Sequence, residues 1–156
     1  MNYTIRQAKS EDVSAIKPLF PRLASFELPP QRVPNDLWQA DLELLEDWSR
    51  DETGKVFVLV AVDESNRVLG ASVTSLRAEL LSHAPSAHLE VLVVAEGAEG
   101  QGIGKTLIDA TEQAAKSKGA GSMTLHVFAT NTRARSLYQR SGYDEELLRC
   151  IKHFEI

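Results

Sequence analysis

The sequence has one cysteine, few aromatic residues and no long hydrophobic run, and each absence excludes a class of protein. A lone Cys150 excludes an intrachain disulfide and a zinc site built on cysteine pairs. The longest clean apolar run, Val56 to Val62, is far too short to cross a membrane. The opening residues MNYTIRQAKS lack the apolar stretch of a secretory signal, so we expect a cytoplasmic protein.

The composition is that of an ordinary globular protein. With 43% hydrophobic, 25% charged and 6% aromatic residues, the chain is not disordered, collagen-like or a coiled coil. The 22 acidic residues outnumber the 17 basic ones, and the net charge of -5 disfavours binding to nucleic acid or to an anionic membrane. A length of 156 residues predicts a single domain that spans residues 1–156.

Hydrophobic periodicity predicts a mixed sheet with helices on both faces. Pro18 and Pro21 are expected to kink or shorten the first helix, and Asn35 or Asp36 is expected to cap the second. Acidic residues of the second helix, such as Asp41, are expected on its solvated face. In chain order the pattern predicts strands at 3–8, 56–62, 68–80, 88–95, 122–129 and 148–154, with helices at 10–23, 35–50, 102–118 and 131–141.

A glycine-rich segment, GAEGQGIG at residues 97–104, lies between a predicted strand and a predicted helix. Glycines at such a junction allow backbone N–H groups to converge on an anion at the helix N-terminus. A Walker A loop ending in the Gly-Lys-Thr of 104–106 would need glycine at the position of Glu99. A dinucleotide fingerprint that starts at Gly100 would need glycine where the chain has Lys105. Both common nucleotide-binding motifs therefore fail at one residue.

The spacing that fits is x-x-x-Gly-x-Gly, with Gly102 and Gly104 at the start of the helix. It resembles the pyrophosphate loop of the GNAT family of acetyl-CoA-dependent N-acetyltransferases. The strand LEVLVVA stands directly before the loop, and the pattern N-x-x-A-x-x-L-Y-x-x-x-G-Y runs from Asn131 to Tyr143, as in that family. The resemblance implies a single-domain α/β GNAT fold, with a central mixed, mostly antiparallel sheet of six to seven strands flanked by four helices. It also implies acetyl transfer from acetyl-CoA to a primary amine, with no metal.

The resemblance assigns cofactor-binding roles to three segments. Main-chain groups of Leu92, Val93 and Val94 would bind the pantetheine arm as an added strand, with the Val93 N–H as oxyanion donor. Asn131 would hydrogen-bond the pantetheine, cap its own helix, or do both. The family usually has Arg or Gln at the first loop position, so the acidic residue here is expected to point outward and to affect cofactor affinity. The diphosphate would bind the loop residues Glu99, Gly100, Gln101, Gly102, Ile103, Gly104 and Lys105.

Two side chains are candidates for the acid and base that such a transfer needs. Glu90 is the base candidate because it alternates with Leu92 and Val94 on a strand that looks buried, and burial favours proton uptake near neutral pH. The alternative is a structural carboxylate, solvated or paired with His88 or an arginine. Tyr138 is the acid candidate, which the resemblance places beside the cofactor sulfur. The alternative for Tyr138 is an aromatic side chain that packs its helix against the sheet.

The resemblance places the acceptor at the first two helices and the loop between them, here Phe26 to Asp36, where Phe26, Glu27 and Asp36 are candidate contacts. Polyamines, aminoglycosides, amino-acid derivatives and protein amines all stay open, although a proline-stiffened loop favours a small molecule. Cys150 has neither a helix N-terminus nor a same-face histidine beside it, which agrees with direct transfer in a ternary complex. Two other functions remain: an acyl-CoA-binding regulatory domain without catalysis, and an ATP- or GTP-binding protein. Family habit favours a homodimer.

Overall fold

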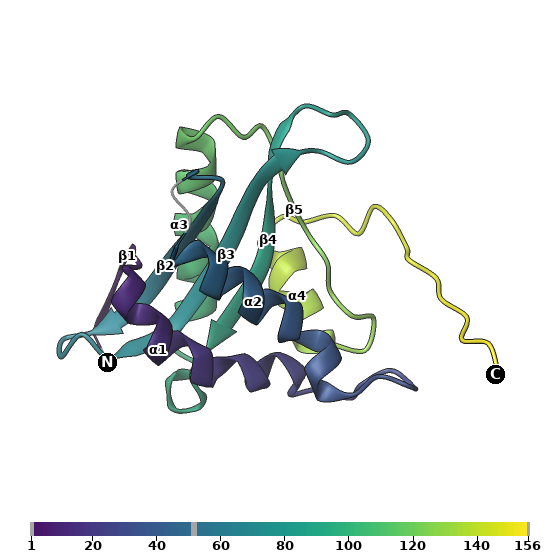
Figure 1. The fold of residues 1–156 in the computed structure, drawn as a ribbon, viewed down its shortest axis with the longest axis horizontal. Coiled ribbons are helices and arrows are strands. Elements are labelled where there is room, and N and C mark those ends of the chain that lie inside the picture. Colours follow the sequence, from purple (N-terminus) through teal and green to yellow (C-terminus); the bar gives the residue numbers. More distant parts are fainter. Residues whose placement is uncertain (1, 51–52, 156) are drawn as a thin grey trace.

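A five-stranded sheet forms the centre of the structure, a computed structural model that describes residues 2–50 and 53–155 (Figure 1). Neighbouring strands are antiparallel except for the last pair, which is parallel. The predicted mixed α/β fold is therefore confirmed, with five strands among the described residues rather than six to seven. In sheet order the strands are β1 (Tyr3–Gln7), β2 (Val56–Asp63), β3 (Val68–Ala78), β4 (Pro85–Val94) and β5 (Met123–Leu125).

Helices cover both faces of this sheet, as Figure 1 shows for α1 and α2 on one side and α3 on the other. The prolines shorten the first helix as predicted, because α1 has four residues and the chain continues from Lys17 as a 3-10 helix that contains Pro18 and Pro21. On one face lie η1 (Ser10–Asp12), α1 (Val13–Ile16), η2 (Lys17–Ala24), η3 (Pro34–Leu37) and α2 (Gln39–Trp48). After β4 come η4 (Glu96–Ala98), α3 (Ile103–Ser117) and, beyond β5, α4 (Thr132–Arg140).

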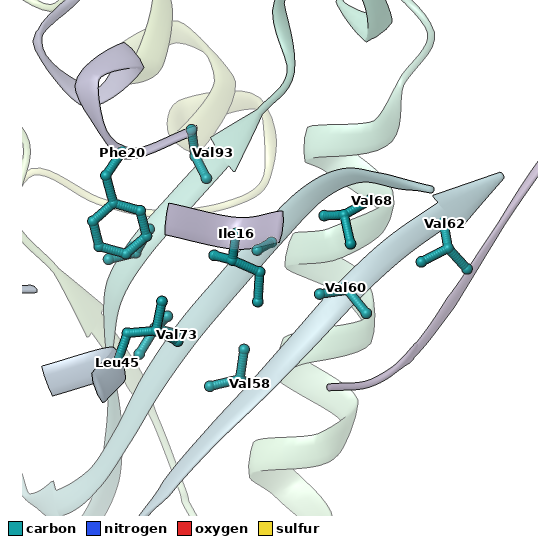
Figure 2. Close-up of a cluster of buried hydrophobic side chains, with 11 residues drawn as sticks. Ile16, Phe20, Leu45, Val58, Val60, Val62, Val68, Val73 and Val93 are labelled. Carbon is teal, nitrogen blue, oxygen red and sulfur yellow. The ribbon is translucent and has the colours of Figure 1, made fainter. Parts of the chain in front are cut away.

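Two hydrophobic layers hold these helices against the sheet. On the α2 side, Ile16, Phe20 and Leu45 are fully buried over the valines of β2 and β3, as Figure 2 shows. On the other side, Ile103 and Leu107 of α3 are buried among the alternate residues of the same strands. Neighbouring residues of one strand belong to different layers, because side chains alternate between the two faces of a sheet. This alternation explains why β2 is apolar throughout.

Three details of the predicted fold are wrong, the first being that the strand predicted at 122–129 is confined to β5, Met123–Leu125. Asp36 does not cap α2: its carboxylate accepts the N–H of Val33 at 3.0 Å and so caps η3, while α2 begins after Trp38. The segment Leu148–Phe154 forms no strand, and residues 144–155 are exposed and run away from the body of the molecule (Figure 1). The physical reason lies in the spacing: the exposed apolar residues at 147, 148, 151 and 154 do not follow the two-residue period of a strand.

No helix in the described part of the chain is both long enough and apolar enough to span a membrane.

Candidate active site

The two strands at the parallel end of the sheet separate at the level of Glu90. β5 pairs with Ala87, His88 and Leu89 of β4, and the last of these pairs is Leu89 with Leu125. From Glu90 to Val94, β4 therefore has β3 on one side and no strand on the other within the described residues. This unpaired edge of β4, which we call the opening, ends where the glycine-rich loop begins, and every second residue along it turns its backbone N–H and C=O away from β3. A chain-like ligand can enter such an edge by strand addition.

A β-bulge turns Glu90 to the opposite face from the one predicted. Val73 of β3 pairs with Val91, while the next residue, Thr74, pairs with Leu89, so Glu90 is the extra residue. The predicted alternation of Glu90 with Leu92 and Val94 is wrong, because those two side chains pack on the α3 side. The Glu90 carboxylate instead accepts a 3.0 Å hydrogen bond from the hydroxyl of Ser75, on the α2 side.

Glu90 belongs to a polar cluster on the α2 side of β4 and β5. His88, which is only 5% exposed at its side chain, places Nε2 3.5 Å from Glu90 Oε1. Its other ring nitrogen, Nδ1, lies 2.8 Å from the hydroxyl oxygen of Thr124, and the ring of His126 stands edge-on to it at 4.7 Å. A carboxylate oxygen only accepts hydrogen bonds, so this arrangement favours a neutral His88 with its proton on Nε2 and with Thr124 as donor to Nδ1.

Burial controls the charge of two groups in this cluster. It lowers the pKa of His88 to about 4, and the nearby Arg77 and His126 add to this shift, so the ring is neutral at pH 7. It also raises the pKa of Asp41, on α2, to about 6, and the nearby carboxylate of Glu90 adds to this shift. Asp41 is therefore not a solvated residue of the helix surface, as its sequence position suggested. The contact with His88, predicted from the sequence as an alternative to a catalytic role for Glu90, is present at 3.5 Å.

Replacing Asp41 by Asn is expected to stabilise the protein at neutral pH. The pKa of Asp41 is higher in the folded than in the unfolded state, so the folded state binds this proton more tightly. The free energy of unfolding therefore falls as the pH rises from about 4 to about 6, and this loss is complete above that range. After allowance for solvent screening, Asp41→Asn should raise the free energy of unfolding by about 1–2 kcal/mol at pH 7.5. Urea denaturation at pH 7.5 and at pH 3.5 measures it, and the gain should vanish at the lower pH. Glu43→Gln, at an exposed position of α2, is the control, and an equal gain in that variant would contradict the assignment.

The glycine-rich loop presents a run of free backbone donors. Ala98 N–H donates to Ala95 and Thr106 N–H to Gly102, both at 3.0 Å, but the backbone N–H groups from residue 99 to 105 have no acceptor among the described residues. Gly100 and Gly102 make this possible, because their φ angles of 79° and 77° belong to the left-handed region. Seven unpaired donors that lead into the first turn of α3 fit an anion such as a diphosphate.

The backbone of β4 alternates between β3 and the opening. Ala95 N–H donates to Leu69 of β3 at 2.8 Å, so in an antiparallel ladder Val93 also turns its N–H toward β3. The backbone N–H and C=O groups of Leu92 and Val94 then point away from β3, toward the opening. Consistently, the carbonyl oxygen of Val94 is free of β3 and accepts a 2.6 Å hydrogen bond from Nε of Arg22. The register therefore favours Leu92 and Val94 over Val93 as donors to a ligand.

Glu99 is held by two arginines that the sequence did not single out. Its carboxylate accepts a hydrogen bond from Arg22 of η2 and lies 3.5 Å from Nη1 of Arg133 of α4. The side chain of Glu99 is 35% exposed, so it reaches outward but is not free. Lys105, by contrast, pairs with Asp109 one turn later on α3, with Nζ 2.6 Å from Oδ1.

The predicted residues of α4 lie as follows. Asn131 caps the helix, since its side-chain oxygen accepts the N–H of Ala134 at 3.3 Å. Tyr138 packs edge-on against Tyr143, with ring centroids 6.0 Å apart, and burial raises the pKa of Tyr138 to about 12. Its hydroxyl makes no hydrogen bond within the described chain, whereas that of Tyr143 donates to Glu112 at 2.8 Å. Tyr138 therefore keeps its proton at neutral pH and has it available for a ligand.

The predicted acceptor residues are only partly brought to the site. Phe26 packs against Phe128, which follows β5, with ring centroids 5.6 Å apart. Glu27 and Asp36 are exposed, and Asp36 is used as a cap. The acidic residue that does lie beside Glu90 is Asp41, which sequence reasoning placed on the solvent side of α2. Among the described residues, no group of three His, Cys, Asp or Glu side chains could hold a metal ion.

Comparison with known proteins agrees with this geometry. Over 142 residues the chain is 32% identical to YhfO, an uncharacterized N-acetyltransferase of Bacillus subtilis (strain 168), and the match covers 91% of this chain and 90% of that protein. It is 37% identical over 105 residues to the mycothiol acetyltransferase of Renibacterium salmoninarum, a match that covers 67% of this chain but only 30% of that relative's length. The chain thus spans less than a third of that relative.

A solved structure and a family model complete the comparison. A protein from Pyrococcus furiosus assigned as an acetyl transferase superposes with a TM-score of 0.79 at 26% identity, and the match covers 98% of this chain and 100% of that one. The model of the acetyltransferase (GNAT) family matches residues 21–143, which include β2 to β5, the glycine-rich loop and α4. The chain belongs to the GNAT family, whose members are acyl-CoA-dependent N-acetyltransferases.

Proposed function

We propose that the chain transfers an acetyl group from acetyl-CoA directly to the primary amine of a small cationic molecule. The observation that carries this proposal is the open edge of β4 from Glu90 to Val94, which leads into seven unpaired loop N–H groups. The pantetheine arm fits beside the edge, and the diphosphate fits on the loop. The loop follows the edge in the chain, and the candidate base Glu90 lies at the other end of the edge.

Glu90 is the proposed base. The amine must lose a proton as its nitrogen attacks the thioester carbonyl, and Glu90 would take that proton. Ser75 and His88 hold the carboxylate from two sides, so its oxygens have fixed positions. His88 is neutral and does not neutralise the carboxylate, which keeps Glu90 available as an acceptor.

A backbone N–H group and Tyr138 would stabilise the negative charge that develops on the thioester oxygen and on the departing thiolate. The N–H of Leu92, which faces the opening, would donate to the thioester oxygen as negative charge develops on it. As the carbon–sulfur bond breaks, the Tyr138 hydroxyl would give its proton to the departing thiolate. The exposed position of Cys150 on the C-terminal segment offers no enzyme thiol near this opening, in agreement with direct transfer.

A cationic acceptor is favoured by the charge of the cluster. The Glu90 carboxylate is close enough to Asp41 to raise the pKa of Asp41, and no arginine or lysine among the described residues pairs with either group. An acceptor with a second ammonium group would relieve this repulsion by lying against Asp41 while its reacting amine faces Glu90. A monoamine, which has no second ammonium group, would leave Asp41 without a partner.

Ligand-dependent stability and thiol release together test the proposal. CoA at about 100 times its Kd should add about 2.7 kcal/mol to the free energy of unfolding, which raises Tm by several degrees, whereas ATP with Mg²⁺ should leave Tm unchanged. Release of free CoA thiol from acetyl-CoA should be faster with diamines than with monoamines of the same length. A Tm that responds to ATP and not to CoA would contradict the cofactor assignment. Equal rates for diamines and monoamines would contradict the acceptor class alone.

A further inference from the structure

The carboxylate of Glu99 joins three segments around the glycine-rich loop. Arg22 reaches it from η2 and Arg133 from the first turn of α4. These residues are 77 and 34 positions from Glu99, so only the fold brings them together. Arg133 is largely exposed, with 76% of its side chain accessible, whereas Arg22 is 22% exposed.

Arg22 is fixed by a second hydrogen bond. Its Nε donates to the carbonyl oxygen of Val94 at 2.6 Å, on the side of β4 that faces the opening. One guanidinium therefore bridges the end of β4 and the first residue of the loop. The two arginines and Glu99 carry a net charge of about +1 beside the unpaired N–H groups of the loop. The two arginines and the loop N–H groups together favour a ligand that carries more negative charge than the single carboxylate of Glu99.

We propose that Glu99 is an internal counter-ion, which occupies Arg22 and Arg133 until the diphosphate of acyl-CoA replaces it. The inference rests on the proposed function, because it takes acyl-CoA as the ligand of this loop. An ion pair that stays partly exposed, as Glu99 does at 35% and Arg133 at 76%, contributes little stability, so its exchange has a small cost. Arginine binds phosphate oxygens in a planar, bidentate manner, and a diphosphate supplies two such groups. The acidic residue that stands at the first loop position would then tune cofactor affinity rather than prevent binding.

Calorimetric titration with CoA tests this exchange. Glu99→Gln should bind CoA about three- to five-fold more tightly than the unmodified protein at low ionic strength, because no carboxylate has to be displaced. The gain should shrink at about 0.15 M salt, since exposed charges are then screened. Arg133→Gln should weaken binding about three- to five-fold. The titration should give the same ratios with 3′-dephospho-CoA, which keeps the diphosphate.

Two matched variants serve as controls. Glu96→Gln removes the same charge three residues earlier, where the side chain is exposed and has no partner among the described residues, and it should change the affinity less than Glu99→Gln. Arg140→Gln is the control for Arg133→Gln on the same helix. If Glu99→Gln binds no more tightly than Glu96→Gln while the unmodified protein binds CoA, the counter-ion role is wrong and the proposed function stands. A gain that is lost with 3′-dephospho-CoA overturns the diphosphate as the competing group. If neither the unmodified protein nor any variant binds CoA, both the counter-ion role of Glu99 and the proposed function are wrong.

Discussion

Glu90→Gln is expected to lower kcat/KM for acetyl transfer by about 100- to 1,000-fold, in the lower part of the range of about 100- to 10,000-fold that a general base contributes. Glutamine keeps the shape of the side chain and can still accept the hydroxyl of Ser75, but it cannot take a proton from the amine. The affinity for CoA should not change, because the loop that holds the diphosphate lies at the other end of the open edge of β4. Steady-state kinetics with the amine found by the thiol-release screen, together with CoA titration, measures both quantities.

The structural alternative for Glu90 makes a different prediction. If the carboxylate serves only to hold His88, Glu90→Gln should lower Tm and leave the turnover of the folded fraction unchanged. Glu96→Gln, an exposed carboxylate near the loop, should alter neither turnover nor Tm and controls for the change in charge. A pH profile adds a separate readout: the rise in rate that accompanies deprotonation of the base should be missing in Glu90→Gln.

Gly70→Val is expected to destabilise the fold and weaken CoA binding together. A Cβ at Gly70 would lie 2.9 Å from the carbonyl oxygen of Val93, 3.2 Å from Leu107 and 3.3 Å from Ile103. The first contact is with the backbone of β4 and the others are with the start of α3, so relief of the clash must move the two elements that flank the glycine-rich loop. Overpacking of this kind costs about 1–3 kcal/mol, and Tm should fall by about 4–10 °C. Affinity for CoA should fall about ten-fold, if the moved elements cost about 1.4 kcal/mol on binding.

Gly97→Val controls for the loss of a glycine in the same segment, at a position before the unpaired N–H groups of residues 99–105. A Cβ there would meet nothing within 4 Å, and Gly97 has no positive φ angle, so Tm and CoA affinity should remain unchanged. Differential scanning calorimetry and CoA titration of both variants make the comparison. A stable Gly70→Val protein with unchanged affinity would show that β4 and α3 can separate without moving the loop, contrary to the packing described above.

The elements that local patterns determine could be predicted from the sequence. The strands β2, β3 and β4 and the helix α3 appear within a few residues of their predicted bounds, because burial on one or both faces leaves a clear periodicity. The glycine-rich loop could be predicted for a similar reason, since positive φ angles at Gly100 and Gly102 are a local demand on residue type.

Features that depend on pairing between distant segments could not be predicted. The bulge at Glu90 arises from the register of β4 against β3, and no change in the alternation of the sequence marks it. The bond from Arg22 to Glu99 joins residues 77 positions apart. Asp41 reads as a surface residue of an amphipathic helix until the fold places it beside the Glu90 cluster. The candidate base was therefore found for a partly wrong reason, and its neighbours required the structure.

The exposed C-terminal segment carries a single site for attaching a spectroscopic label. Its thiol at position 150 is the one cysteine of the sequence, and Figure 1 shows the segment directed away from the sheet. A maleimide dye would attach at a single known point without touching β4, the loop or α4. Fluorescence anisotropy and single-molecule measurements of ligand binding are thus accessible with the unmodified sequence, and no background cysteine has to be removed.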